Sequence, residues 1–300
     1  MTELSTDLGQ PPEAATFEAQ RRRLLGISYR ILGSFADAED VVQDAWLRWS
    51  GTDVAQVQNP EAFLTTVVTR LSLDRLRTLK ARREVYSGPW LPEPVAADAD
   101  PEAAAELADS LSLALLVVLE KLSPLERAAF VLREVFSEPY AVVAEILGRD
   151  EAAVRQLVHR ARQHVDAGGT RYRADRATHD EVVDRFLAAC QNADLEALLS
   201  VLAPDVVLVS DGGGVAKAPV RPIAGEDKVG RFMIGATSKG LAGTTVSLEV
   251  FNGQLGLIAR ADGRAVIALS FRVADGQVQT LHLMANPAKL AALDTPVPLE

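Results

Sequence analysis

The sequence lacks the features of several common protein classes. A single cysteine, Cys190, among 300 residues excludes an internal disulfide framework and a cysteine-cluster zinc site. The longest stretch without a charged side chain, residues 276–288, has 13 residues, and a membrane-spanning helix requires roughly 18 or more. The N-terminal segment has neither a basic start nor an apolar run, unlike a signal peptide. We therefore expect a soluble, cytoplasmic protein with no metal, no cofactor and no membrane partner.

Charge is distributed unevenly along the chain. Acidic residues outnumber basic ones by 41 to 31, and the net charge of −10 argues against indiscriminate nucleic-acid binding. Residues 70–83 nevertheless contain six basic residues and one acidic residue, and residues 151–173 contain five basic residues and two acidic residues. Residues 91–109 contain six acidic residues and no basic one. This pattern indicates a masked or regulated anion-binding surface, although solvated helix faces would have the same composition.

Hydrophobic periodicity divides the chain into helical and strand-rich parts. Apolar residues recur at three- and four-residue spacing over residues 17–85, and helices resume from about residue 102 to 165. Three prolines within residues 89–94 predict a linker between these parts. After residue 179, one amphipathic helix precedes short β-branched runs separated by Asp-Gly and Asn-Gly turns. That order is typical of an α+β domain with a curved, largely antiparallel sheet.

The second helical part contains the pattern of a helix-turn-helix. Ser123-Pro124-Leu125-Glu126 is a capped helix start, a second helix follows Pro139 and ends at Gly148, and a third begins at Glu151. The third helix has an apolar stripe opposite arginine and glutamine side chains, which read guanine and adenine edges. A recognition helix requires this division, although a helical hairpin with a polar face would share it. The candidate DNA contacts are Arg155, Gln156, His159, Arg160 and Arg162.

Residues 33–46, GSFADAEDVVQDAW, resemble the second conserved region of group-four (extracytoplasmic-function) sigma factors. In that family an acidic helix docks on the clamp coiled coil of bacterial core RNA polymerase. Residues 60–83 resemble the part that melts and reads the minus-ten promoter element, and the helix-turn-helix resembles the fourth region, which reads the minus-thirty-five element. The resemblance assigns polymerase binding to Asp37, Glu39, Asp40, Gln43 and Asp44, and minus-ten DNA binding to Arg70, Arg75, Arg77, Lys80 and Arg82.

Three short motifs are similar to signatures of the SigJ-like subfamily: WLPEP at residues 90–94, DGGG at 211–214 and NPAKL at 286–290. Members of this subfamily carry a fused SnoaL-like domain of the nuclear-transport-factor-like cone fold. The resemblance implies regulatory contacts through Trp90, Leu91, Pro92, Glu93, Pro94, Asp211, Gly212, Gly213, Gly214, Asn286, Pro287, Lys289 and Leu290. The sequence departs from the subfamily at Val215, where a lysine is usual, and at Ala288, where an aspartate is usual.

The expected fold is multidomain: two all-α sigma modules, the second with the helix-turn-helix, followed by an α+β SnoaL-like cone. The expected division is a flexible tail at 1–15, the second-region domain at 16–88, an acidic linker at 89–110, the fourth-region domain at 111–168, a linker at 169–178 and the regulatory domain at 179–295. The resemblance implies that the acidic linker mimics nucleic acid in the RNA channel of the polymerase. A solvated spacer is the alternative.

Two functions remain open from the sequence. The first is a sigma factor that binds core polymerase, directs promoter-specific initiation and is controlled in cis by its C-terminal domain, without a catalytic residue. The second is a helix-turn-helix regulator whose cone binds or isomerises a small molecule. Isomerisation needs a carboxylate base in an apolar cavity, for which the candidates are Asp205, Asp211 and Glu249. His282 either faces that cavity with Asp211 or lies at the surface. We expect no catalysis, and a small-molecule ligand in the cone stays a candidate partner.

Overall fold

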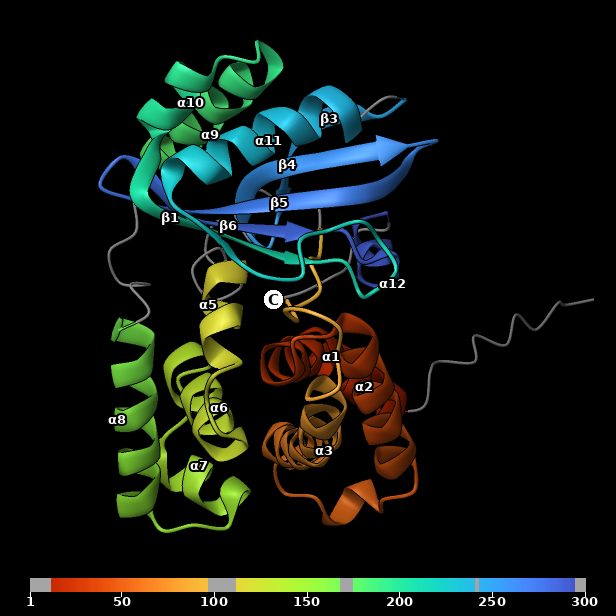
Figure 1. Cartoon of the computed structure of the whole chain (residues 1–300). Helices are drawn as coiled ribbons and strands as arrows, with labels where there is room; N and C mark the ends of the chain where they lie inside the picture. Colours follow the sequence, from red (N-terminus) through yellow and green to blue (C-terminus); the bar gives the residue numbers. More distant parts are fainter. Residues whose placement is uncertain (1–11, 97–111, 168–174, 241–242, 295–300) are drawn as a thin grey trace, which may run out of the picture.

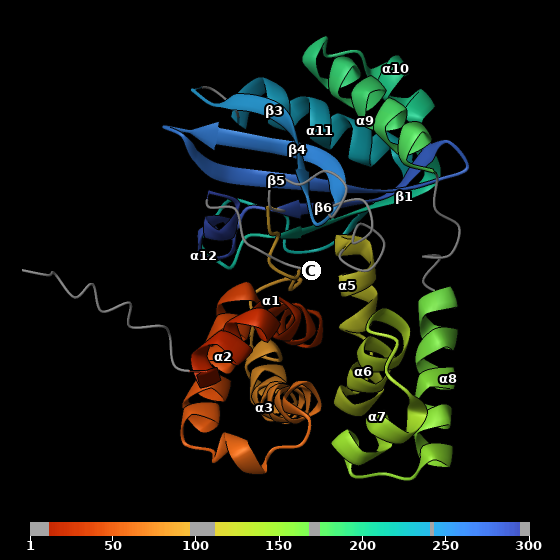
Figure 2. The same cartoon turned by 180° about the vertical axis from the view of Figure 1, so that it is seen from behind.

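The computed structural model describes residues 12–96, 112–167, 175–240 and 243–294, and it has three parts (Figure 1). Two helical modules lie side by side, and an α+β domain lies across one end of both (Figures 1 and 2). The second-region module contains α1 (Pro12–Leu32), α2 (Phe35–Ser50), the short η1 (Val54–Gln56) and α3 (Pro60–Arg83). The fourth-region module contains α5 (Leu113–Leu119), α6 (Pro124–Phe130), the π-helical turn η2 (Val131–Val135), α7 (Tyr140–Leu147) and α8 (Glu151–Ala167).

Side-chain caps fix where these helices begin and end. The Ser34 hydroxyl caps α2, and the Asn59 side chain followed by Pro60 starts α3. Ser123 and Glu126 form the predicted capping box at α6. Gly148 adopts a left-handed conformation with φ of 62°, which ends α7 and lets the chain turn into α8. The predicted helix-turn-helix is therefore confirmed as a local structure.

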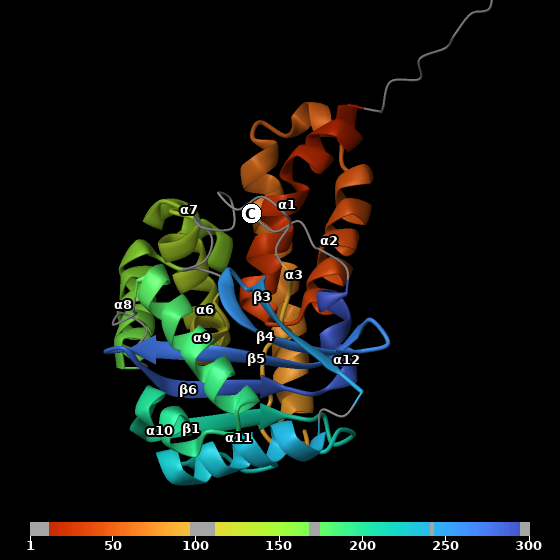
Figure 3. The same ribbon diagram turned by 90° about the horizontal axis from the view of Figure 1, so that it is seen from above.

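The C-terminal domain is a curved sheet with helices on its inner face (Figure 3). The helices are α9 (Arg176–Gln191), α10 (Leu195–Val201) and α11 (Glu226–Gly240), with the short α12 (Pro287–Leu290) and η3 (Ala291–Leu293) at the end. The strands are β1 (Leu202–Asp211), β2 (Ile223–Ala224), β3 (Thr245–Phe251), β4 (Gln254–Ala261), β5 (Arg264–Ala274) and β6 (Gln277–Met284). They pair in the order β2-β1-β6-β5-β4-β3, with only β1 and β6 parallel among the described pairs. The predicted α+β architecture is confirmed.

The described residues form three apolar clusters, and the first and the third join different parts of the chain. The first runs without a break through both helical modules, from Leu24 and Leu64 to Leu116 and Val158. The second lies between the inner face of the sheet and α9, α10 and α11. The third lies on the outer face of the sheet, where Leu91 is buried between the strands and the helical modules. Each module thus buries part of its apolar surface against another module.

Two helices begin earlier than the predicted boundaries. Helix α1 begins at Pro12, so residues 12–15 belong to a helix and not to the tail, because proline fits the first helical turn and Glu13 favours its dipole. Helix α9 begins at Arg176 behind the capping side chain of Asp175, so the second linker ends before residue 178. Residues 97–110 of the acidic linker, with the predicted helix start near residue 102, lie outside the described residues. No described helix is both long and apolar enough to cross a membrane.

Candidate polymerase- and promoter-binding surfaces

Helix α2 presents the predicted polymerase-binding face to solvent. Glu39, Asp40, Gln43 and Asp44 are exposed, opposite a buried stripe that includes Val41 and Val42. Asp37 is half-buried and accepts a hydrogen bond of 2.8 Å from Arg75 Nε, so its charge is partly neutralised. Leu47, 61% exposed, lies one turn beyond Gln43 on the same face. Sequence reasoning missed Leu47, although its position four residues after Gln43 could have indicated it.

The predicted minus-ten residues do not form one free surface. Arg70 donates to the backbone carbonyl oxygens of Ile146, at 3.2 Å, and Glu145, at 3.3 Å, near the C-terminus of α7. Lys80 Nζ donates to the carbonyl oxygen of Leu122, at 2.6 Å, between α5 and α6. All three acceptors are backbone carbonyl oxygens of the fourth-region module.

The other three minus-ten candidates point elsewhere. Arg75 pairs with Asp37 and Asp40 on α2, and Arg77 pairs with Asp74 one turn earlier on α3. Arg82 is exposed at the end of α3. The structure therefore brings Arg70 and Lys80 to the fourth-region module and leaves Arg77 and Arg82 on the surface.

A cluster of three charged side chains lies between the two helical modules. Glu120, at the end of α5, accepts hydrogen bonds from Arg83 of α3 and from Arg127 of α6, whose side chain is fully buried. Arg83 also donates to the carbonyl oxygen of Leu32, at 2.7 Å, and Arg127 Nε donates to that of Arg30, at 2.9 Å. We call Arg83, Glu120 and Arg127 the inter-module triad. Sequence reasoning missed this triad, because its members lie up to 44 residues apart in the chain.

The outer face of α8 carries the predicted minus-thirty-five residues, all of them exposed. Arg155, Gln156, His159 and Arg160 line one shallow hollow. Arg155 is also paired with Glu151, and Arg160 with Glu126. Arg162 lies apart from the hollow and makes two hydrogen bonds, of 2.8 and 2.9 Å, to the carboxylate of Glu134. Four of the five candidates therefore converge on one surface, which no described part of the chain covers.

The three subfamily motifs meet at the buried carboxylate of Asp211. This carboxylate accepts hydrogen bonds from the Tyr86 hydroxyl (2.6 Å), the Leu91 backbone N–H (2.9 Å), the Gly213 backbone N–H (3.0 Å) and the Lys289 ammonium (2.7 Å). Lys289 Nζ also donates to the Leu91 carbonyl oxygen, at 2.5 Å. We call residues 90–94, 211–214 and 286–290 together the latch, because they join the C-terminal domain to the second-region module.

The WLPEP segment of the latch is bound along its length. The ring of Trp90 contacts two cations, with Arg83 Cζ 3.4 Å and Lys289 Nζ 3.8 Å from its centroid. Leu91, Pro92 and Pro94 are buried, and Glu93 accepts hydrogen bonds from the first backbone N–H groups of α2. Burial lowers the pKa of Lys289 to about 8, although Asp211 opposes that shift. This part of the linker is therefore a structural contact and not a solvated spacer.

A second contact, which sequence reasoning missed, lies at the turn between β3 and β4. The Asn252 side chain accepts from the Val95 N–H, at 3.0 Å, and donates to the Tyr29 hydroxyl, at 2.8 Å. The Tyr29 hydroxyl in turn donates to the Glu93 carbonyl oxygen, at 2.6 Å. The sequence indicated Asn252 only as a hairpin residue, which it also is, with φ of 49°.

Gly213 is required at its place in the latch, because a side chain there would strain the backbone and clash. Its φ is +64°, and an added Cβ would lie 2.6 Å from the Asn286 side chain. We expect Gly213→Ala to destabilise the protein by about 2 kcal/mol or more, from left-handed strain of roughly 1–2 kcal/mol and the loss of Asn286 packing. Urea unfolding measures this. Gly263→Ala is the matched control, because Gly263 has φ of +79° but no neighbour within 4 Å. Equal losses in the two variants would contradict a packing role for Gly213.

The residues considered for catalysis lie at the surface, in an ion pair, in the latch or buried on the outer face of the sheet. Asp205 is exposed, Glu249 is paired with Arg260 at 2.8 Å, and Asp211 lies in the latch. His282 is neither in the cavity nor at the surface, contrary to both sequence alternatives. It lies with Asp211 on the outer face of the sheet, and that face is buried against the helical modules. Burial, with Arg272 and Lys121 nearby, lowers the pKa of His282 to about 4.

Protonation of His282 should make the free energy of unfolding depend on pH. Its folded pKa lies below the unfolded value of 6.5, so the unfolded chain binds the proton first as pH falls. The stability from its neutral form is complete above pH 6.5 and is lost progressively down to about pH 4, by at most about 3 kcal/mol. Urea unfolding at pH 7 and pH 5 measures the loss. His282→Gln should reduce the difference, and an unchanged difference would contradict this origin.

Two helical modules are joined by a latch to an α+β domain, and one of the modules has an exposed helix-turn-helix. This arrangement is that of a multidomain DNA-binding protein of the transcription machinery. Comparisons with known proteins identify the family. Residues 16–82 match Sigma-70 region 2, and residues 112–165 match Sigma-70 region 4.

The chain is 45% identical to ECF RNA polymerase sigma factor SigJ of Mycobacterium tuberculosis, over 92% of this chain and 93% of that protein. It is 30% identical to the probable ECF RNA polymerase sigma factor SigI of the same species, over 94% and 96%. The crystal structure of M. tuberculosis SigJ superimposes with a TM-score of 0.77 at 43% identity, covering 93% of this chain and 99% of that one. The chain therefore belongs to the extracytoplasmic-function RNA polymerase sigma factors. It binds core polymerase and directs transcription initiation.

Proposed function

We propose that this sigma factor is held in a closed, inactive state by contacts within its own chain. In this proposal α2 binds core RNA polymerase, α3 binds the minus-ten element, and α8 binds the minus-thirty-five element. The C-terminal domain acts as a tethered regulator that must release the helical modules before all three surfaces can work together. A tethered regulator acts at high effective concentration without a separate partner.

The observation that carries this proposal is the burial of α3 against the fourth-region module. Arg70 and Lys80 are bound to backbone carbonyl groups of that module, and Arg83 is held in the inter-module triad. A strand of promoter DNA bound by the same cations would have to replace these carbonyl oxygens and carboxylates with phosphates. The two modules therefore have to separate before α3 binds DNA.

In this proposal the latch stabilises the closed state. It connects Asp211 and Lys289 of the C-terminal domain to the segment that caps α2. Through Trp90 and Arg83 the latch also contacts the inter-module triad. Release of the latch would thus weaken the contact between the modules.

Polymerase binding should depend on the exposed face of α2. We expect Asp44→Lys to weaken binding to core RNA polymerase at least tenfold, because a cation would replace an acid opposite a basic partner. Leu47→Ala should also weaken binding, by the loss of an apolar contact. Co-elution with core polymerase on a sizing column measures both. Asp184→Lys, exposed on α9, is the matched control for charge reversal. Equal binding by Asp44→Lys and Asp184→Lys would contradict the assignment.

We further propose that a small molecule binds in the C-terminal domain. None of Asp205, Asp211 and Glu249 is among the described residues that line its pocket, so the proposal includes binding and no catalytic step.

A further inference from the structure

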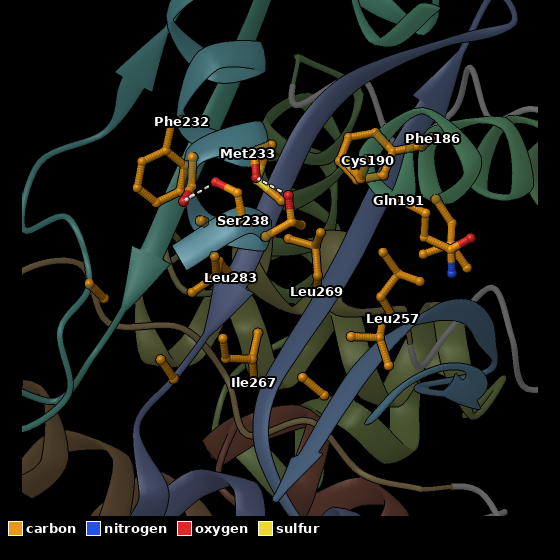
Figure 4. Close-up of a pocket in the computed structure, with 18 of the residues that line it drawn as sticks. Phe186, Cys190, Gln191, Phe232, Met233, Ser238, Leu257, Ile267, Leu269 and Leu283 are labelled. Atoms are coloured by element: carbon orange, nitrogen blue, oxygen red, sulfur yellow. Dashed lines mark hydrogen bonds between the residues drawn. The ribbon is translucent and has the colours of Figure 1, made fainter. Parts of the chain in front are cut away.

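The C-terminal domain contains an apolar pocket between the inner face of the sheet and helices α9 and α11. Its volume is about 700 Å³, within the roughly 300–1,000 Å³ of sites that enclose small organic ligands. Figure 4 shows Phe186 and Cys190 from α9, Phe232 and Met233 from α11, and Leu269 from the sheet around one space.

The walls favour a ligand with an apolar body. Most of the described lining residues are aliphatic or aromatic. Burial raises the pKa of the Cys190 thiol to about 12, so this side chain is a neutral thiol at physiological pH and forms part of the apolar wall.

One charge distinguishes the mouth of the pocket from its walls. Lys217 is exposed and is the only charged side chain among the described lining residues. No carboxylate among those residues balances it. A ligand with its body inside and a negative group at the mouth would therefore bury apolar surface and keep its charge next to a cation in water.

The pocket shares two chain segments with the latch. Lys217, Ala218 and Pro219 of its wall begin three residues after Gly214 of the latch, and the Ser210 hydroxyl donates to the Pro219 carbonyl oxygen at 2.7 Å. On the other side Ala285 lines the pocket, and its N–H donates to the Asp211 carbonyl oxygen at 2.8 Å. A ligand that shifts either segment would therefore act on the residues that hold Leu91 and Trp90.

We propose that this pocket binds an amphiphilic monocarboxylate with an apolar body, such as a fatty acid, and that its occupancy is linked to the latch. The carboxylate lies at Lys217 and the apolar body lies between Phe186, Phe232 and Leu269. The binding stands by itself, whereas the link rests on the proposed closed state.

The test is calorimetric titration of the full-length protein with dodecanoate and, as the uncharged equivalent, dodecanol. We expect saturable binding of one dodecanoate per chain and weaker binding of dodecanol. Lys217→Met should weaken dodecanoate binding about fivefold, the effect of an exposed ion pair, and should not change dodecanol binding. Lys228→Met, which removes an exposed lysine of α11 that is not in the lining, should change neither.

A pocket-filling variant tests the location. Gly235 lines the pocket on α11, and a Cβ added there meets no atom within 4 Å. Gly235→Leu should therefore fill the space and abolish binding of both probes, while leucine also favours the helix. The absence of saturable binding by the wild type, or unchanged binding by Gly235→Leu, would overturn the site. Equal binding of dodecanoate and dodecanol would overturn the carboxylate assignment.

The link to the latch is tested by reciprocity. If occupancy changes the latch, breaking the latch must change the affinity for dodecanoate by the same factor. We expect Asp211→Ala to change the dissociation constant at least fivefold, and an unchanged constant would overturn the link. Failure of the closed state itself would be detected separately, by the affinity of the protein for core polymerase.

Discussion

Replacing Asp211 with alanine is expected to open the latch. The carboxylate of Asp211 is fully buried and accepts four hydrogen bonds, one of them from the Lys289 ammonium, which is 7% exposed. Its loss leaves the buried Lys289 ammonium without the carboxylate that pairs with it and the Leu91 N–H without its acceptor. Breaking a buried ion pair by removing one partner costs about 3–5 kcal/mol.

This loss should separate domains before it unfolds them, because each part retains most of its own apolar cluster. We therefore expect the radius of gyration of Asp211→Ala, measured by X-ray scattering, to exceed that of the wild type. The double variant Asp211→Ala/Lys289→Met is the control. It leaves no unpaired charge, so it should lose less stability than the sum of the two single variants. A compact Asp211→Ala protein, or strictly additive losses, would contradict the role of the latch.

The second large effect is expected from Glu120→Ala in the inter-module triad. The substitution leaves Arg127, fully buried, and Arg83, 13% exposed, without their shared carboxylate. We again expect a loss of about 3–5 kcal/mol, located at the contact between α3 and the fourth-region module. Hydrogen exchange should become faster in α3 and α6, and urea unfolding should measure the loss.

Glu84→Ala is the matched control for this substitution, because Glu84 is the exposed glutamate that directly follows α3 and Arg83. We expect it to change neither exchange nor stability by more than about 0.5 kcal/mol. If Glu120→Ala and Glu84→Ala behaved alike, the triad would not hold the modules together.

Local patterns were sufficient to predict much of the fold. The capped helix start at Ser123 and the end of the second helix at Gly148 are confirmed, and so are the five strands that β-branched runs indicated. Helix α11 was not predicted. It contains Gly230 and Gly235, which have low helix propensity, and it forms because Val229 and Met233 pack against the sheet.

The closed state could not be predicted in the same way. The motifs identified Trp90, Asp211 and Lys289 as contacts, and the structure brings these three together. Tyr86, Asn252 and Glu120 were missed, because each bonds to a residue distant in sequence, as Asn252 does to Val95, 157 positions away. A single sequence contains no record of such distant pairs, whereas caps and turns involve neighbours.

The most direct test of the closed state is the affinity of the full-length protein for core RNA polymerase, titrated for the wild type and for Glu120→Ala. The exposed face of α2 is accessible in both states, but the proposal requires the two helical modules to separate before the binding surfaces work together. Tight binding then belongs to the open state, and the apparent affinity is reduced by the fraction of molecules that are open. If Glu120→Ala destabilises the closed state by about 3 kcal/mol relative to the open state, the apparent affinity for core polymerase can increase by up to about 100-fold. We predict that Glu120→Ala binds at least tenfold more tightly than the wild type, with Glu84→Ala unchanged. Equal affinities of a folded Glu120→Ala and the wild type would contradict the closed state.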